Sequence, residues 1–220
     1  MGLEEGVHFT VKMPEGGKAG YVSILKEGLA HAARLSVYGS GRQRELAAAF
    51  VNYILRRVKE TGKEVYKKAT KIVDEGMSRG SLTLKGFEKE VEVDGRRHKV
   101  KVIDGEAVEE GRGGRKLLRI RITAEVDCVR SEYTITYGRR GRNNAAVGRA
   151  YAKADAPDGR EKDAERISAL IKALTGKEPK VIERCDGRID IICGGEHLDG
   201  FARYAELADA VEKWLEETRR

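Results

Sequence analysis

The sequence lacks the patterns that identify the commonest catalytic, metal and membrane proteins. No uninterrupted apolar run approaches the ~18 residues that a membrane span needs. There is no Walker loop for nucleotide phosphates and no HExxH pair for zinc. The four histidines are scattered, none has a second ligand at i+4, and His98 falls on an apolar strand face where a satisfied core histidine is expected. We therefore expect a non-enzymatic protein with no cofactor and no metal.

Cysteine and side-chain amides are also scarce. Cys128, Cys185 and Cys193 are too few and too irregular for a disulfide framework, and no CxxC pair is present for zinc. We expect the three cysteines to be buried or unreactive thiols. An intracellular disulfide remains an alternative if the protein comes from a hyperthermophile. The chain has one glutamine and three asparagines while 36% of its residues are charged, which is typical of hyperthermophile proteins. Residues 1–11 carry acids instead of a basic, apolar start, so we expect no secretory signal and a cytoplasmic location.

Positive charge is unevenly spread along the chain. The formal net charge is +7, with 14 basic and 9 acidic residues over 1–80, 15 and 11 over 81–142, and 14 and 16 over 143–220. The basic excess therefore lies in the first two thirds. This moderate bias favours contact with an anionic partner but does not require it.

The first 80 residues predict a helical layer. A short strand over 7–13 leads through the turn at 14–17 to a helix near 19–35, whose apolar residues recur at helical spacing. Ser40 with Gln43, and Thr61 with Glu64, form capping boxes that predict two further helices.

The middle of the chain predicts an antiparallel sheet. Asp94-Gly95 marks a two-residue hairpin that pairs Val93 with Arg96, and a second hairpin over 117–137 turns at Asp127-Cys128. Apolar side chains then share one face of each hairpin, and charged ones share the other. The fold class expected is α+β, with the N-terminal helical layer on this four-stranded antiparallel sheet, followed by a small βαββα subdomain.

The last part of the chain predicts that subdomain. Residues 139–144 are the best candidate linker, so we expect a basic domain at 1–142 and a slightly acidic one at 143–220. The terminal helix, 197–218, carries a strongly amphipathic pattern. It is a candidate surface for a protein partner or for self-association.

Three clusters of arginine and glycine are the candidate binding sites. One lies at a helix N-terminus, where free N–H groups favour an anion, and two flank the second hairpin as flexible loops. Such side chains suit phosphate contacts, which position a protein on nucleic acid without reading its sequence. We therefore expect a nucleic-acid-binding protein that contacts mainly the phosphate backbone, of DNA or RNA. The residues are Arg42, Arg44, Arg112, Arg115, Lys116, Arg139, Arg140 and Arg142.

Two alternatives remain open from the sequence. One alternative is a metal-dependent nuclease, because Pro157-Asp158 followed by Glu178-Pro179-Lys180 matches the PD…ExK motif of such enzymes. This alternative requires the acids Asp155, Asp158 or Glu178 to converge on a metal ion. The other alternative is a protein-interaction module that uses the 197–218 helix. An exposed apolar stripe of more than several hundred Å² on that helix would favour this alternative.

Three stretches resemble the PaRep-type paralogous repeat family of Pyrobaculum and related hyperthermophilic archaea. They begin at Phe9 (FTVKMPEGGKAGY), Tyr151 (YAKADAP) and His197 (HLDGFARYAELA). The resemblance runs from about residue 7 onward and implies an archaeal hyperthermophile source, but no activity. The helix–hairpin–helix order near the C-terminus is also similar to part of a LAGLIDADG homing endonuclease repeat, although the helix ending in Gly-x-Asp-Gly that supplies the metal-binding acid is missing.

Overall fold

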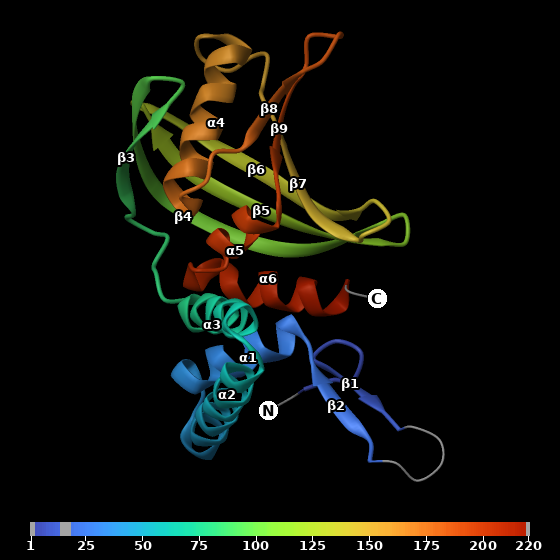
Figure 1. The fold of residues 1–220 in the computed structure, drawn as a ribbon. Coiled ribbons are helices and arrows are strands. Elements are labelled where there is room, and N and C mark those ends of the chain that lie inside the picture. The colour runs from blue at the N-terminus through green and yellow to red at the C-terminus, as the bar shows by residue number, and fades with distance from the viewer. Residues whose placement is uncertain (1–2, 14–18, 219–220) are drawn as a thin grey trace. The chain divides into compact units, whose positions relative to one another are not determined.

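The protein divides into two compact units. The computed structural model describes residues 3–13 and 19–218, and the units are residues 1–79 and 80–218 within that range (Figure 1). The expected boundary at 142/143 does not coincide with this division, because Arg140 and Ala145 pair across it in adjacent strands. Among the helices of the described ranges, none is long and apolar enough to cross a membrane.

The first unit contains a hairpin and three helices. Its elements are β1 (Phe9–Lys12), β2 (Tyr21–Ile24), α1 (Lys26–Tyr38), α2 (Gly41–Thr61) and α3 (Lys63–Ser78). The expected helix at 19–35 was wrong in its first half, because β2 pairs with β1 there and the helix begins only at Lys26. Tyr21, Val22 and Ile24 are aromatic or β-branched residues, which favour an extended strand over a helix. The predicted turn at 14–17 lies outside the described residues.

The three helices share a small core of their own. Leu29, Ala32 and Ala33 of α1 pack with Val51 of α2 and Val73 of α3. A Cβ atom at Gly76 of α3 would lie 2.3 Å from the carbonyl oxygen of Ala30, so the two helix backbones touch at this glycine. The predicted capping boxes were wrong. Ser40 is the N-cap residue of α2 but makes no side-chain cap hydrogen bond, and Thr61 is the last residue of α2, where its hydroxyl donates to the Arg57 carbonyl oxygen.

The second unit is built on a seven-stranded antiparallel sheet in the order β3-β4-β5-β6-β7-β9-β8 (Figure 1). Its strands are β3 (Glu88–Val93), β4 (Arg96–Arg112), β5 (Arg115–Val126), β6 (Val129–Arg140), β7 (Ala145–Tyr151), β8 (Lys180–Glu183) and β9 (Ile189–Cys193). Its helices are α4 (Gly159–Thr175), α5 (Gly195–Phe201) and α6 (Ala205–Glu217). The α+β class is confirmed, but the expected sheet of four strands was wrong. The strands expected in a separate βαββα subdomain continue the same sheet.

The C-terminal helices cover the buried face of the sheet. Leu118, Ile120 and Tyr137 of the sheet form one core with Leu170 of α4 and Trp214 of α6. Every residue named in this core lies in the second unit. The expectation that the N-terminal helices supply the layer over the sheet is therefore corrected: that layer is α4, α5 and α6.

Both predicted hairpins are confirmed in register. Val93 pairs with Arg96 across Asp94-Gly95, and Val126 pairs with Val129 across the second turn. Asp127 and Cys128 both have positive φ angles, 51° and 65°, which is the backbone of the tight turn that joins twisted strands.

Candidate nucleic-acid interface

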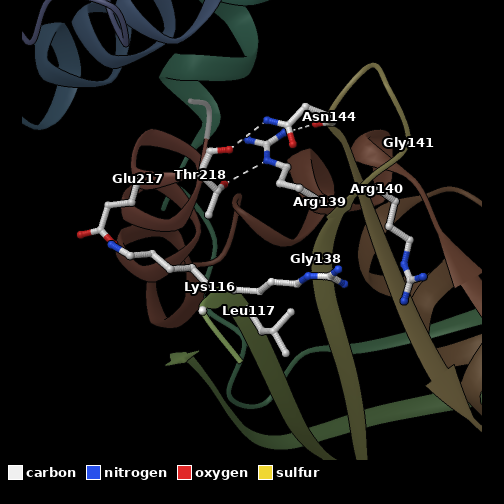
Figure 2. Close-up of a pocket in the computed structure, with 11 residues that line it drawn as sticks. Lys116, Leu117, Gly138, Arg139, Arg140, Gly141, Asn144, Glu217 and Thr218 are labelled. Atoms are coloured by element: carbon white, nitrogen blue, oxygen red, sulfur yellow. Dashed lines mark hydrogen bonds and ion pairs between the residues drawn. The ribbon is translucent and has the colours of Figure 1, made fainter. Parts of the chain in front are cut away.

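Two β-turns meet at one end of the sheet and enclose a pocket of about 850 Å³ (Figure 2). One turn joins β4 to β5 and the other joins β6 to β7. Because β5 and β6 pair antiparallel, the start of β5 and the end of β6 lie at the same end of the sheet. The pocket is lined by Gly114, Arg115, Lys116, Leu117, Gly138, Arg139, Arg140, Gly141, Asn144, Glu217 and Thr218. The structure thus brings together two of the three predicted basic clusters.

The cluster at 112–116 lies at a tight two-residue turn between paired strands, not in the longer loop that was expected. Arg112 pairs with Arg115 across Gly113 and Gly114, whose φ angles are 56° and 74°. Glycine adopts such left-handed angles without a steric penalty, so the tight turn requires it here. Arg115 is consequently fixed at the mouth of the pocket with its side chain exposed. The side chain of Arg112 lies outside the described part of the structure.

Arg139 points inward and holds the C-terminal end of α6 (Figure 2). Its Nε donates to Thr218 Oγ1 at 2.9 Å, and Nη1 donates to the Asn144 carbonyl oxygen at 3.1 Å. Its guanidinium carbon lies 5.0 Å from the centre of the Trp214 ring. Burial lowers the pKa of Arg139 from its ordinary value. The Arg139 side chain is held by contacts within the protein, so it is less available to a phosphate than an exposed arginine.

Lys116 is paired with an acid from α6. Its Nζ lies 2.5 Å from Glu217 Oε2, and the hydrogen bond from Lys116 is the main cause that holds the pKa of Glu217 below its ordinary value. The Lys116 carbonyl oxygen also accepts a hydrogen bond from Trp214 Nε1 at 3.1 Å. Lys116 therefore contributes less positive charge to the pocket than its formal charge suggests.

Three arginines remain available at this end of the sheet. Arg115 and Arg140 line the pocket, and Arg142 stands in the β6–β7 turn. All three side chains are exposed, and none makes an ion pair with another residue of the described ranges. Figure 2 shows Arg140 pointing away from Arg139. This arrangement presents several guanidinium groups around a concave floor that includes Leu117 and Gly138.

The first predicted cluster belongs to the other unit. Arg42 and Arg44 are exposed in the first turn of α2, whereas every residue of the pocket lies in the second unit. The eight predicted basic residues are therefore divided between the two units, with Arg42 and Arg44 in the first unit and the other six in the second.

Comparison with known proteins identifies the family. A family model described as PaRep2b protein matches residues 1–219. The chain belongs to the PaRep2b family. No curated protein and no solved structure matches it. The expected PaRep-type membership is thus confirmed, whereas no finding supports the LAGLIDADG likeness.

The acids of the nuclease alternative do not meet in this PaRep2b chain. Asp158 is the N-cap residue of α4 and lies 2.5 Å from Arg166, and Glu178 follows the end of the same helix, where it pairs with Lys172 at 2.7 Å. The 17 residues of α4 span about 25 Å at a rise of 1.5 Å per residue. Asp158 and Glu178 therefore lie too far apart to share one ion. None of Asp155, Asp158 and Glu178 belongs to a group of three or more potential metal ligands among the described residues.

The predicted 197–218 helix is two helices, and its apolar stripe is buried. The chain breaks at Ala202–Tyr204, where Leu82 bridges to Tyr204 and the Glu206 carboxylate accepts hydrogen bonds from the backbone of Leu84 and Lys85. Leu198, Phe201, Leu207, Val211 and Trp214 are each at most 1% exposed. The exposed stripe that the protein-interaction alternative required is therefore missing from the described part of this segment.

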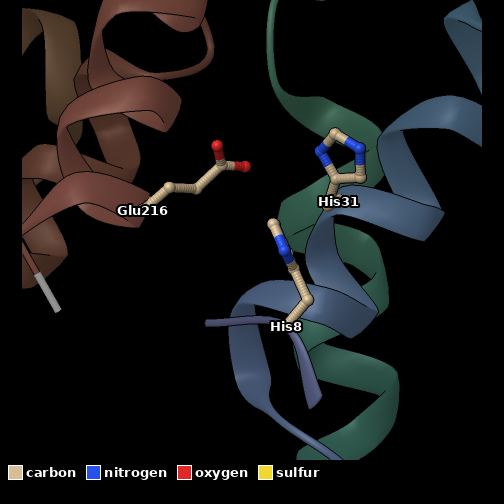
Figure 3. A group of neighbouring side chains, drawn as sticks. All are labelled: His8, His31 and Glu216. Atoms are coloured by element: carbon tan, nitrogen blue, oxygen red, sulfur yellow. The ribbon is translucent and has the colours of Figure 1, made fainter. Parts of the chain in front are cut away.

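The histidines and cysteines are distributed among unrelated environments. His98 is buried with its Nδ1 2.6 Å from Asp127, which confirms its expected place in the core, but its Nε2 has no hydrogen-bond partner among the described residues. In the first unit the rings of His8 and His31 lie with their centres 5.3 Å apart (Figure 3). Cys128 and Cys185 are exposed thiols, and burial raises the pKa of Cys193 to about 12, so that Cys193 remains protonated.

One motif was overlooked in the sequence. Residues 76–80 read Gly-Met-Ser-Arg-Gly, the GxSxG spacing of hydrolases. That motif acts at a sharp strand-to-helix turn, whereas Ser78 is the last residue of α3. Its hydroxyl donates to the Glu75 carbonyl oxygen at 2.9 Å. Ser78 therefore lacks the setting of a catalytic nucleophile.

Proposed function

We propose that this PaRep2b chain binds nucleic acid through the phosphate backbone, without catalysing a reaction on it. The observation that carries the proposal is the convergence of Arg115, Arg140 and Arg142 at one end of the sheet, with no acidic partner among the described residues. In the middle of β5, by contrast, two arginines are paired: Arg119 lies 2.9 Å from Glu110, and Arg121 lies 2.7 Å from Glu106. The arginines at the turns therefore carry charge that no nearby acid of the described ranges neutralises.

The backbone positions of these arginines support this role. A two-residue turn places Arg115 at the start of β5, and the neighbouring end of β6 is held to α6 through Arg139. Arginine forms forked hydrogen bonds to phosphate oxygens. Such contacts position a protein on nucleic acid but do not read its sequence.

The proposal is tested by the fluorescence anisotropy of labelled duplex DNA, single-stranded DNA and RNA at ~0.1–0.2 M salt. The triple variant Arg115→Ala, Arg140→Ala, Arg142→Ala should weaken binding at least tenfold. The matched control replaces Lys180, Arg188 and Arg203 with alanine, which removes three exposed charges from the same unit outside the pocket.

The control is expected to weaken binding only slightly. Equal weakening by the two triple variants would mean that net charge, and not the pocket, governs binding. No binding to any of the three nucleic acids near 50 mM salt would overturn the proposal.

A further inference from the structure

A second, smaller pocket lies where β6 and β7 part. These strands pair from Arg140↔Ala145 to Thr136↔Arg149, and β7 then continues by pairing with β9. A slot of about 150 Å³ lies in this region, lined by Glu132, Tyr133, Thr134, Thr136, Arg149, Tyr151, Lys153, Asp163 and Ile167. Tyr133 and Asp163 belong to the buried side of the sheet and to α4, so the slot reaches from the outward face into the core.

Two residues that line this slot carry a buried hydrogen-bonding group with no partner among the described residues. The groups are the hydroxyl of Tyr133 and the Nε–H of Arg149. Tyr133 is 3% exposed, and burial together with the negative charge of Asp163 raises its pKa to about 12, so its hydroxyl keeps its proton. A buried donor without an acceptor is costly, and native proteins seldom keep one unless water or a ligand satisfies it.

The slot also offers a buried acceptor. Asp163 is 2% exposed, and its Oδ2 accepts one hydrogen bond, from the backbone N–H of Lys153 at 2.7 Å. A carboxylate oxygen accepts more than one hydrogen bond, so capacity remains. The slot thus combines two unsatisfied donors with an acceptor.

The positive and negative side chains that line the slot are equal in number. Arg149 and Lys153 oppose Glu132 and Asp163, so the lining favours a neutral polar group over a phosphate or a carboxylate. The volume suits one six-membered ring, because cavities of about 150 Å³ accommodate benzene. Tyr151, 54% exposed, stands at the rim as an aromatic face.

We propose that the slot binds one unpaired pyrimidine base of the nucleic acid whose phosphates contact the arginine pocket. A pyrimidine presents one ring-edge donor group and two acceptors, which match the carboxylate of Asp163 and the donors of Tyr133 and Arg149. Recognition of bases that are splayed out of a stack uses such edge contacts together with aromatic side chains. This inference rests on the proposed function and adds that the bound strand is single-stranded at the slot.

The two pockets lie along the same strand. Thr136 at the slot and Arg140 at the arginine pocket are four residues apart on the outward face of β6, which is about 13 Å at ~3.3 Å per residue. One short strand of nucleic acid can therefore contact both.

The experiment compares three labelled oligomers of equal length by anisotropy with the full chain: oligo-dT, oligo-dA and an abasic phosphate–sugar strand. The slot predicts that oligo-dT binds about tenfold more tightly than the abasic strand, with oligo-dA between them. Tyr133→Phe, which removes only the hydroxyl, should reduce the advantage of oligo-dT about threefold to tenfold and leave abasic binding unchanged. Tyr204→Phe is the matched control, because it removes a buried tyrosine hydroxyl that donates to Leu174 outside the slot.

The outcomes separate the two proposals. Equal binding of oligo-dT and the abasic strand, unaltered by Tyr133→Phe, overturns the slot and leaves the phosphate function in place. Loss of binding to every oligomer overturns the proposed function, and titration with free thymidine followed by NMR then decides the slot. Shifts confined to slot residues and lost in Tyr133→Phe support it, and unchanged spectra overturn it.

Discussion

The guanidinium carbon of Arg139 lies 5.0 Å from the centre of the Trp214 ring, and its nitrogens donate to Thr218 and Asn144. This one side chain joins the end of β6, the β6–β7 turn and the last turn of α6. An arginine that looks like a phosphate ligand in the sequence is instead a support for the pocket beside it.

Replacing Arg139 should therefore destabilise the second unit. Arg139→Ala removes a cation–π contact and three hydrogen bonds from a half-buried position, and we expect a loss of about 1–3 kcal/mol in the free energy of unfolding. Urea unfolding followed by the fluorescence of Trp214, the single tryptophan, measures this. Arg140→Ala is the control and should change stability by less than about 0.5 kcal/mol. Equal stability of the two variants would contradict the supporting role.

Gly76→Ala should destabilise the first unit although it lies within a helix. Helix propensity alone predicts a gain of about 1 kcal/mol. The new Cβ would lie 2.3 Å from the Ala30 carbonyl oxygen, so α1 and α3 must move apart, at a cost of about 1–3 kcal/mol. Thermal unfolding followed by circular dichroism shows which effect is larger. Gly195→Ala, at the start of α5 with open space around it, is the control that should not lower stability.

Tyr133→Phe should leave stability unchanged or raise it by up to about 1 kcal/mol, because it removes a buried hydroxyl with no partner. Tyr204→Phe removes a hydroxyl that donates to the Leu174 carbonyl oxygen at 3.1 Å and should cost about 1 kcal/mol. Urea unfolding of both variants in ligand-free protein makes the comparison. A larger loss for Tyr133→Phe would show that its hydroxyl is already satisfied without a ligand.

His197 should make stability depend on pH. Its Nδ1 accepts a hydrogen bond from the Gly194 N–H, and burial lowers its pKa from its ordinary value near 6.5. The unfolded chain then binds the proton more readily than the fold, so stability falls as pH drops below about 6.5 and stops falling below the folded pKa. In His197→Gln, the glutamine side chain can still accept a hydrogen bond from the Gly194 N–H, but it does not titrate. We expect it to lose less stability than the parent between pH 7.5 and 5.5 in urea unfolding. An identical loss would contradict this.

Local patterns predicted the hairpins because their turns and strands are adjacent in the sequence. A two-residue turn at Asp94-Gly95 fixes the register of every pair that follows, and side-chain alternation then assigns the faces. The same alternation places Arg139 on the face of Ile135 and Tyr137 and Arg140 on the other face. That signal could have separated the supporting arginine from the free one.

The parts of the fold that the sequence did not predict depend on contacts between residues far apart in the chain. β7 joins the sheet by pairing with β6 and β9, and the terminal helix breaks where Glu206 accepts hydrogen bonds from Leu84, 122 residues away. Strand β4 extends through Gly105, a residue type that suggests a strand end. A Cβ at this position would lie 2.2 Å from Leu84 Cδ2, so the side chain of Leu84, 21 residues earlier in the chain, packs against this glycine. No local pattern contains these partners.

The salt dependence of nucleic-acid binding tests the central claim most directly. Each phosphate neutralised contributes about 0.7 to 0.9 to the slope of log affinity against log salt. The Arg115, Arg140, Arg142 triple alanine variant should therefore reduce the slope by about 2 to 3, whereas the Lys180, Arg188, Arg203 control keeps the parent slope. An unchanged slope in the arginine variant would contradict phosphate binding at the pocket.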